Sequence, residues 1–148
     1  MIVIRNIQRT NLREYSLAKL VKKFSKSEKD ISITFDARIS DFGSYIYNGE
    51  KQRHEIKISS KTFQFNDPSS KTYELIGTIL HELKHVQQQE DLGTRSFFSE
   101  KFALNKCIKN EAAATYYSLC EVEARLFEEK NVLSAVEYYW KCSSDVVK

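Results

Sequence analysis

The sequence predicts an α+β domain in which a small sheet is enclosed by helices. Apolar and polar residues alternate between Ile31 and Ser60, which is typical of strands, and helical spacing occurs on both sides of that region. The stretch HELKHVQQQ, residues 81–89, continues the helical spacing after the sheet. We expect one domain over residues 1–148, with an N-terminal helix, a mostly antiparallel sheet of about three strands, the HELKH helix and C-terminal helices.

The first helix is expected to begin after Thr10 or Asn11 and to reach about Ser25. Thr and Asn commonly cap helices, because their side chains accept a hydrogen bond from the first turn of the backbone. The apolar residues that follow recur at i, i+3, i+4 and i+7, the spacing of one buried helix face. They are Leu17, Leu20, Val21 and Phe24.

Three short segments predict the sheet. ISITF and HEIKIS alternate apolar and polar residues, and SYIYNGEK between them contains Asn48-Gly49, a strong signal for a hairpin turn. HEIKIS begins at His54, and its Lys and Glu residues indicate a partly exposed strand. If this strand formed the edge of the sheet, residues 54–59 could hold an extended peptide by main-chain pairing.

The HELKH helix is expected to begin at Ser69 or Ser70, after the break at residues 66–69, and to reach about Glu90. Asp91-Leu92-Gly93 would then end it. Beyond it, residues 94–109 have no defined pattern, a strong helix is expected over residues 111–130, and a last helix ends near Trp140. The buried stripe of the HELKH helix is formed by Leu75, Ile79, Leu83 and Val86.

Composition limits the class of protein. Hydrophobic residues make up 41% of the chain and charged residues 29%, as in folded soluble proteins. No apolar run approaches the roughly 18 residues of a membrane span, and the start of the chain lacks the features of a secretory signal. The three cysteines show no CxxC spacing, which argues against a disulfide framework or a zinc knuckle. We therefore expect a cytoplasmic protein with no membrane partner.

Positive charge is concentrated at the start of the chain. Residues 1–30 contain eight Lys or Arg and three acidic residues, while the whole chain carries a net charge of only +3. A nucleic-acid partner would suit this charge, although a solvated helix face explains it more simply. A DNA-associated protease or DNA binder is accordingly one alternative function.

The HELKH stretch predicts a zinc site. His81 and His85 are four residues apart, so their imidazoles lie about 5–6 Å apart on one face of a helix and can share one tetrahedral ion. Both project from the side opposite the buried stripe, on the same line as Gly77. Glu82 is turned about 100° from His81, where it could act as the general base on a zinc-activated water. Gln88 also lies on this side, and we expect it to be solvated polar surface.

Two histidines leave such a site one protein ligand short. The third histidine, His54, is expected to be an ordinary strand residue. Glu121 is favoured, because it flanks an apolar helical line on which an unligated carboxylate would be desolvated. Glu111 and Glu123 remain alternatives; Glu111 begins a second Glu-x-x-Ala segment, and Glu123 points about 200° away from Glu121. The weaker candidates are Glu100, Cys107 and Cys120.

HELKH followed by CEVEARLF resembles the gluzincin-type metallopeptidases, in which a later helix supplies a glutamate ligand. The spacing Glu121, Ala124, Phe127 is similar to that of ImmA/IrrE-like peptidases and of small phage-type zincins. The resemblance implies a minimal zincin-like metallopeptidase domain over residues 1–148, with Zn²⁺ held by His81, His85 and Glu121. It also implies hydrolysis of peptide bonds in a peptide or protein substrate, and a source in a phage or mobile element.

A non-catalytic module is the other alternative. A zincin-fold protein could bind a partner protein with its metal absent or purely structural. The presence of Glu82 favours an enzyme, because a structural metal site has no use for a general base at that position.

Overall fold

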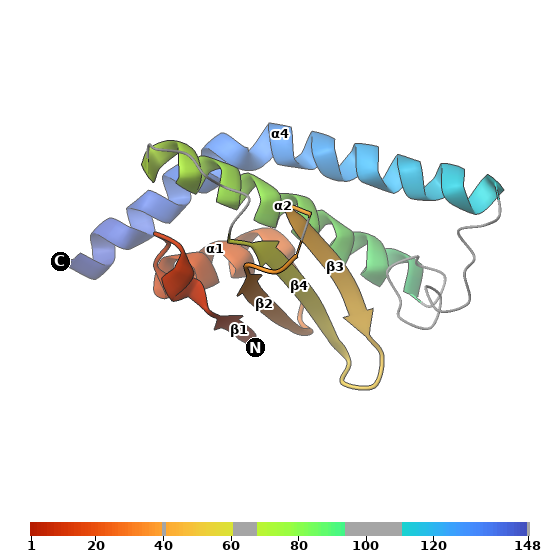
Figure 1. Cartoon of the computed structure of the whole chain (residues 1–148), viewed down its shortest axis with the longest axis horizontal. Coiled ribbons are helices and arrows are strands. Elements are labelled where there is room, and N and C mark those ends of the chain that lie inside the picture. Colours follow the sequence, from red (N-terminus) through yellow and green to blue (C-terminus); the bar gives the residue numbers. More distant parts are fainter. Residues whose placement is uncertain (40, 61–67, 94–110, 148) are drawn as a thin grey trace.

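The computed structural model describes residues 1–39, 41–60, 68–93 and 111–147 (Figure 1). The chain is α+β, with a four-stranded mixed sheet and three α-helices in this part of the chain. In chain order the elements are β1 (Ile2–Arg5), the short 3₁₀ helix η1 (Ile7–Arg9), α1 (Glu14–Ser25), β2 (Asp30–Asp36), β3 (Gly43–Asn48), β4 (Arg53–Ser59), α2 (Pro68–Leu92) and α4 (Glu111–Val147).

The sheet differs from the prediction in strand number and direction. Its order is β1-β2-β4-β3; β1 pairs parallel to β2, β2 parallel to β4, and only β3 and β4 are antiparallel. The predicted turn at Asn48-Gly49 does join β3 to β4. The expectation of a mostly antiparallel sheet of about three strands was therefore wrong, apart from this hairpin.

Strand β1 was missed because IVIR is a continuous run of β-branched residues without alternation. Such a run has high strand propensity, and that was the available signal. Helix α1 connects β1 to β2, and a strand–helix–strand connection of this kind produces parallel neighbours. Strand β4 consequently lies inside the sheet, and β1 and β3 form its edges.

Helices α1 and α2 cover one face of the sheet, and α4 contacts both helices on their far side (Figure 1). The alternation in β2 and β4 directs one set of side chains into this core and leaves charged residues such as Glu55 and Lys57 on the other face. The sheet contributes Ile31, Ile33, Phe35, Ile56 and Ile58 to the core, and α2 contributes Leu75, Ile76, Ile79, Leu80, Leu83 and Val86.

The boundaries of α1 and α2 are close to those predicted. Helix α1 ends at Ser25 as expected, but it begins at Glu14, and no side chain caps it. Helix α2 begins at Pro68, slightly before the predicted serines, because proline is well suited to a first helical position. It ends at Leu92, and Gly93 follows with a φ of +58°, as expected for a glycine that terminates a helix.

The two predicted C-terminal helices are one continuous helix, α4, of 37 residues. The expected boundary after Lys130 was wrong. Asn131 is a weak helix former, but its side-chain amide donates to the Phe127 carbonyl over 2.9 Å, and the helix continues through it. Within the described ranges, no helix combines the length and the apolar character that a membrane span requires. Residues 94–109, for which no pattern was predicted, lie outside the described residues.

Candidate metal centre

Helix α4 runs back along α2 in the opposite direction (Figure 1). This arrangement covers the side of α2 that carries the HELKH histidines. His85 is consequently only 2% exposed, although a helix-face argument had assigned its side of α2 to the polar surface. Ala124 on α4 is fully buried and has a small side chain, which lets the two helices approach closely at this level.

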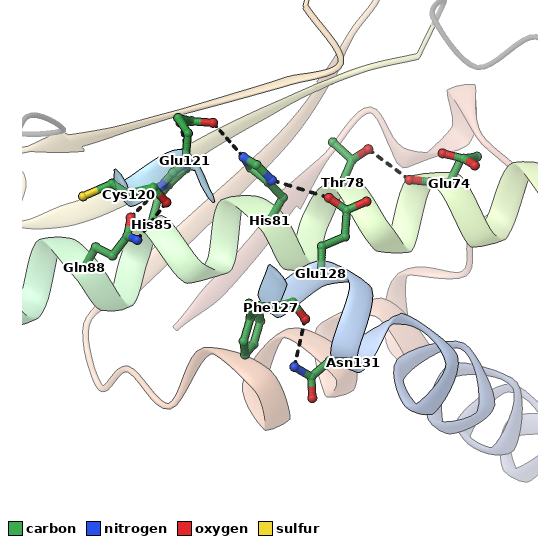
Figure 2. Close-up of polar contacts among 10 residues, drawn as sticks. All are labelled: Glu74, Thr78, His81, His85, Gln88, Cys120, Glu121, Phe127, Glu128 and Asn131. Atoms are coloured by element: carbon green, nitrogen blue, oxygen red, sulfur yellow. Dashed lines mark hydrogen bonds and ion pairs between the residues drawn. The ribbon is translucent and has the colours of Figure 1, made fainter. Parts of the chain in front are cut away.

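His81, His85 and Glu121 come together between the two helices (Figure 2). The Nε2 atom of His81 lies 3.0 Å from one oxygen of the Glu121 carboxylate, and Nε2 of His85 lies 2.9 Å from the other. The candidate ligand atoms of the three residues all lie within 4.8 Å of one another. This is the only group of three or more such side chains in the described part of the chain that could hold a metal ion.

Gln88 fixes the orientation of His85. The Gln88 amide nitrogen donates to the backbone carbonyl of Cys120 over 3.0 Å, so its oxygen faces Nδ1 of His85, 2.7 Å away. His85 must therefore donate from Nδ1, which directs the other nitrogen, Nε2, towards Glu121. Gln88 is 5% exposed, and the expectation that it would be solvated surface was wrong because α4 covers it.

Glu128 performs the same task for His81. Its carboxylate lies 3.4 Å from Nδ1 of His81, on the side of the ring opposite Glu121 (Figure 2). Gly77 makes room for this contact, because a Cβ atom at that position would lie 3.0 Å from the other Glu128 oxygen. Sequence reasoning missed Glu128. Its spacing of seven residues from Glu121, two turns along the same helix face, was the signal that could have identified it.

Glu82 is 5% exposed and lies beside the cluster without belonging to it. The start of strand β3 packs directly against it. A Cβ atom on Gly43 would lie 3.1 Å from a Glu82 carboxylate oxygen and 2.9 Å from the methyl group of Thr78. Glycine at this position therefore allows the backbone of the edge strand to approach the carboxylate closely.

The surroundings shift the pKa values of three of these groups. Burial raises the pKa of Glu82 to about 7, against the attraction of the two histidines. Burial lowers the pKa of His81, but hydrogen bonds to Glu121 and Glu128 outweigh it, and the pKa rises to about 9. Hydrogen bonds from His81 and His85 hold the pKa of Glu121 far below its ordinary value. Glu121 is thus a carboxylate at any physiological pH, as a metal ligand must be.

The donor set fits a zinc ion. Two imidazole nitrogens and a carboxylate are the ligand types of catalytic zinc sites, at distances of about 2.0–2.2 Å from the metal. Ligand atoms at the corners of such a tetrahedron are about 3.3–3.5 Å apart. The 2.9 and 3.0 Å contacts between the histidines and Glu121 would need to lengthen by only a few tenths of an ångström. Both Nδ1 atoms have acceptors, as is usual for histidines that bind metals.

The other predicted candidates are not in the cluster. Glu123 is 59% exposed and pairs with Lys84 at 3.3 Å. Cys120 is buried, and it is its backbone carbonyl that faces the site, through Gln88. The side chain of Glu111 lies outside the described residues, as do Glu100 and Cys107.

His54 is completely buried, in contrast to the partly exposed strand residue that was predicted. Its Nδ1 lies 2.6 Å from the Tyr45 hydroxyl, and its Nε2 lies 3.0 Å from the carboxylate of Glu90 at the end of α2. The Tyr45 ring is stacked towards His85, with ring centroids 6.3 Å apart. His54 thus joins β4, β3 and α2 behind the metal cluster, and buried polar groups of this kind require such partners.

The burial of Glu82 predicts a pH-dependent stability difference. Its pKa is about 7 in the folded chain against an ordinary value of 4.5, so the folded chain holds a proton that the unfolded chain releases between these pH values. Wild-type protein should therefore lose stability as pH rises through this window, whereas Glu82→Gln resembles the protonated acid at every pH. After chelation, the two proteins should be equally stable at pH 4.5, and the variant should be more stable by on the order of 3 kcal/mol above pH 7.

Urea unfolding from pH 4.5 to 8 measures this difference. Titration of His81 occurs in both proteins and should largely cancel. A constant difference across the pH range would show that Glu82 is not desolvated as described.

Gly43→Ala should destabilise the protein by about 1–3 kcal/mol, because the added methyl group overpacks the β3–α2 contact. It would lie 2.9 Å from Thr78, 3.1 Å from Glu82 and 3.2 Å from Ile58. Gly49→Ala in the same hairpin is the matched control, since nothing lies within 4 Å of its added Cβ. Thermal and urea unfolding compare the two; equal stability of both variants would contradict the tight contact at Gly43.

The geometry can hold one metal ion on two imidazoles and a carboxylate, with a second, buried carboxylate beside it and two side chains that orient the histidines. Comparison of the chain with protein-family models, with curated proteins and with solved structures found no match.

Proposed function

We propose that this protein is a zinc-dependent metallopeptidase of the gluzincin type, with a minimal zincin-like fold. The observation that carries the proposal is the convergence of His81, His85 and Glu121 beside a buried Glu82. The cluster supplies three protein ligands, which leaves a fourth position for water or substrate, as in catalytic zinc sites. A structural zinc site would instead be closed by a fourth protein ligand.

When bound, zinc would supply Lewis acidity, lowering the pKa of a water molecule towards about 7 and polarising the scissile carbonyl. Glu82 is the general base that takes a proton from the attacking water, and it then delivers the proton to the leaving amine. A carboxylate with a pKa of about 7 is well matched to both transfers at neutral pH. Gln88 and Glu128 hold the imidazoles in orientation, so that little rearrangement is required for binding.

An extended peptide substrate is proposed to bind along β3. Residues 54–59 of β4 cannot serve as the edge proposed from the sequence, because they pair with β2 on one side and β3 on the other. Strand β3 has only one neighbouring strand, β4, and its first residue, Gly43, lies against Glu82. A peptide added to this edge would run past the general base.

Metal content tests the proposal directly. Purified protein should bind one zinc ion, lose peptide hydrolysis on chelation and regain it when zinc is restored. Zinc uptake should release protons, because His81 with a pKa of about 9 must give up its Nε2 proton to become a ligand. Protein that takes up no zinc, or cleaves peptides equally well after chelation, would contradict the proposal.

A non-catalytic interaction module is the second candidate, favoured only by the direct contacts between Glu121 and both histidines, which complete a hydrogen-bonded group without any ion. Zinc binding without hydrolysis, in a protein with an intact Glu82, would favour this candidate over the peptidase.

A further inference from the structure

A second feature lies far from the metal cluster, where α1 meets the C-terminal half of α4 (Figure 1). A hollow of about 230 Å³ opens there between the two helices. From Glu121 to Tyr138 the helix advances 17 residues, or about 26 Å, so the hollow and the metal cluster are separate. Its lining residues are Tyr15, Lys19, Tyr138, Lys141 and Cys142.

The lining residues follow the helical repeat on both sides of the hollow. Tyr15 and Lys19 are four residues apart on α1, and Tyr138 and Cys142 are four residues apart on α4, with Lys141 beside them. Two segments far apart in the sequence therefore bring two ammonium groups and two phenols to one hollow. The basic character of the first helix, noted in the sequence, is extended by residues from the other end of the chain.

The positive charge at the hollow is not neutralised by the described residues. Lys19 lies over the ring of Tyr15, 5.5 Å from its centroid, and Lys23 lies over the ring of Tyr138 at 4.4 Å. Neither of these lysines, nor Lys141, forms an ion pair with a carboxylate in the part of the chain that the structure describes. Exposed acidic residues do occur on the same helices, at Glu14 and Glu137.

The hollow also supplies neutral hydrogen-bond donors. The Tyr138 hydroxyl and the Cys142 thiol share a hydrogen bond, and desolvation together with this bond raises the pKa of Tyr138. The phenol is therefore protonated at neutral pH and can donate. Two ammonium groups and phenolic O–H donors match a phosphate monoester, which carries a charge of about −1.5 to −2 and three acceptor oxygens. A carboxylate would offer one charge and two oxygens.

We propose that the hollow between α1 and α4 binds the phosphate group of a small ligand about the size of a mononucleotide. Its volume of about 230 Å³ lies just below the roughly 300 Å³ at which pockets for drug-sized ligands begin. That volume accommodates a phosphate with an attached sugar or ring and is too small for a folded partner. The site does not depend on the metal cluster.

Titration of full-length, zinc-loaded protein with adenosine monophosphate, adenosine and inorganic phosphate, followed by calorimetry, tests this site. Adenosine monophosphate should bind at least about tenfold more tightly than adenosine, because a hydrogen bond to a charged group contributes roughly 1.5–3 kcal/mol. Inorganic phosphate should compete with it. Lack of binding by both phosphate-containing probes, or equal binding of adenosine, would overturn the proposal.

Matched variants locate the binding. Lys19→Gln with Lys141→Gln should weaken adenosine monophosphate binding by at least about tenfold, with an unchanged melting temperature. Lys51→Gln with Lys57→Gln removes the same charge from the β3–β4 hairpin and should change affinity less than about twofold, because these lysines lie outside the hollow. Equal losses in both double variants would show general charge attraction and would overturn the site.

Two further arms exclude other sources of binding. Affinity should be the same in zinc-loaded and chelated protein; binding that disappears with the metal would assign the phosphate to the metal cluster instead. A 5′-phosphorylated oligonucleotide should bind no more tightly than the mononucleotide. Affinity that rises with strand length and falls steeply with salt would indicate contact with a nucleic-acid backbone and would overturn the small-ligand assignment.

Discussion

Glu82→Gln is expected to reduce peptide hydrolysis by roughly 10²–10⁴-fold while zinc content stays at one ion per chain. Glutamine has the size of glutamate, so the contacts with Gly43 and the core are preserved. It cannot accept a proton from the attacking water at neutral pH. The metal should be retained, because Glu82 is not one of the three residues whose ligand atoms converge.

Glu74→Gln is a matched control, since it makes the same chemical change on the same helix, two turns before His81 (Figure 2). Its activity should stay within about threefold of wild type, because Glu74 lies outside the cluster. Hydrolysis can be followed with a labelled unfolded protein and by labelling new N-termini in a proteome treated with each form. Full activity of Glu82→Gln would remove the general-base role, even if zinc is bound.

The features that sequence reasoning predicted well depend on local geometry. The spacing of Leu75, Ile79, Leu83 and Val86 fixes one buried side of α2, and all four are at most 1% exposed. The same rotation directs His81 and His85 together to another side. These relations follow from 3.6 residues per turn and need no knowledge of what packs against the helix.

The features that it missed depend on contacts between distant segments. Gln88 and His54 are buried because α4 covers one side of α2 and the end of α2 closes over β4. A polar pattern at Gln88 predicts solvent only if nothing covers that face, and α2 is covered on two sides. Parallel pairing of β1 with β2 is equally non-local, since it depends on how α1 crosses the sheet.

The choice among the three glutamates shows both kinds of argument at once. Helical facing separated Glu121 from Glu123, and the structure agrees, since only Glu121 contacts the histidines. It could not decide between Glu121 and Glu111, because both segments have the same Glu-x-x-Ala pattern. The antiparallel alignment of α4 on α2 brings residue 121 level with His81 and His85 (Figures 1 and 2).

Glu121→Ala is expected to lower zinc affinity by more than the roughly 10–100-fold that is usual when a residue behind a metal ligand is replaced. It would leave two imidazoles where a catalytic site has three protein ligands. Competition with a chromophoric chelator measures the affinity, and circular dichroism shows whether the fold is retained. Hydrolysis should fall together with zinc occupancy.

Glu123→Ala and Glu111→Ala are the matched controls, because each removes a carboxylate from the same helix. Glu123 is exposed and its carboxylate contacts Lys84 and Gln88, each at 3.3 Å, so we expect its loss to change zinc affinity only a few-fold. Glu128→Gln should give an intermediate loss of about 10–100-fold, since it orients His81 from behind. If Glu111→Ala lost zinc and Glu121→Ala kept it, the ligand would be Glu111; the contacts of Glu121 with both histidines predict the reverse.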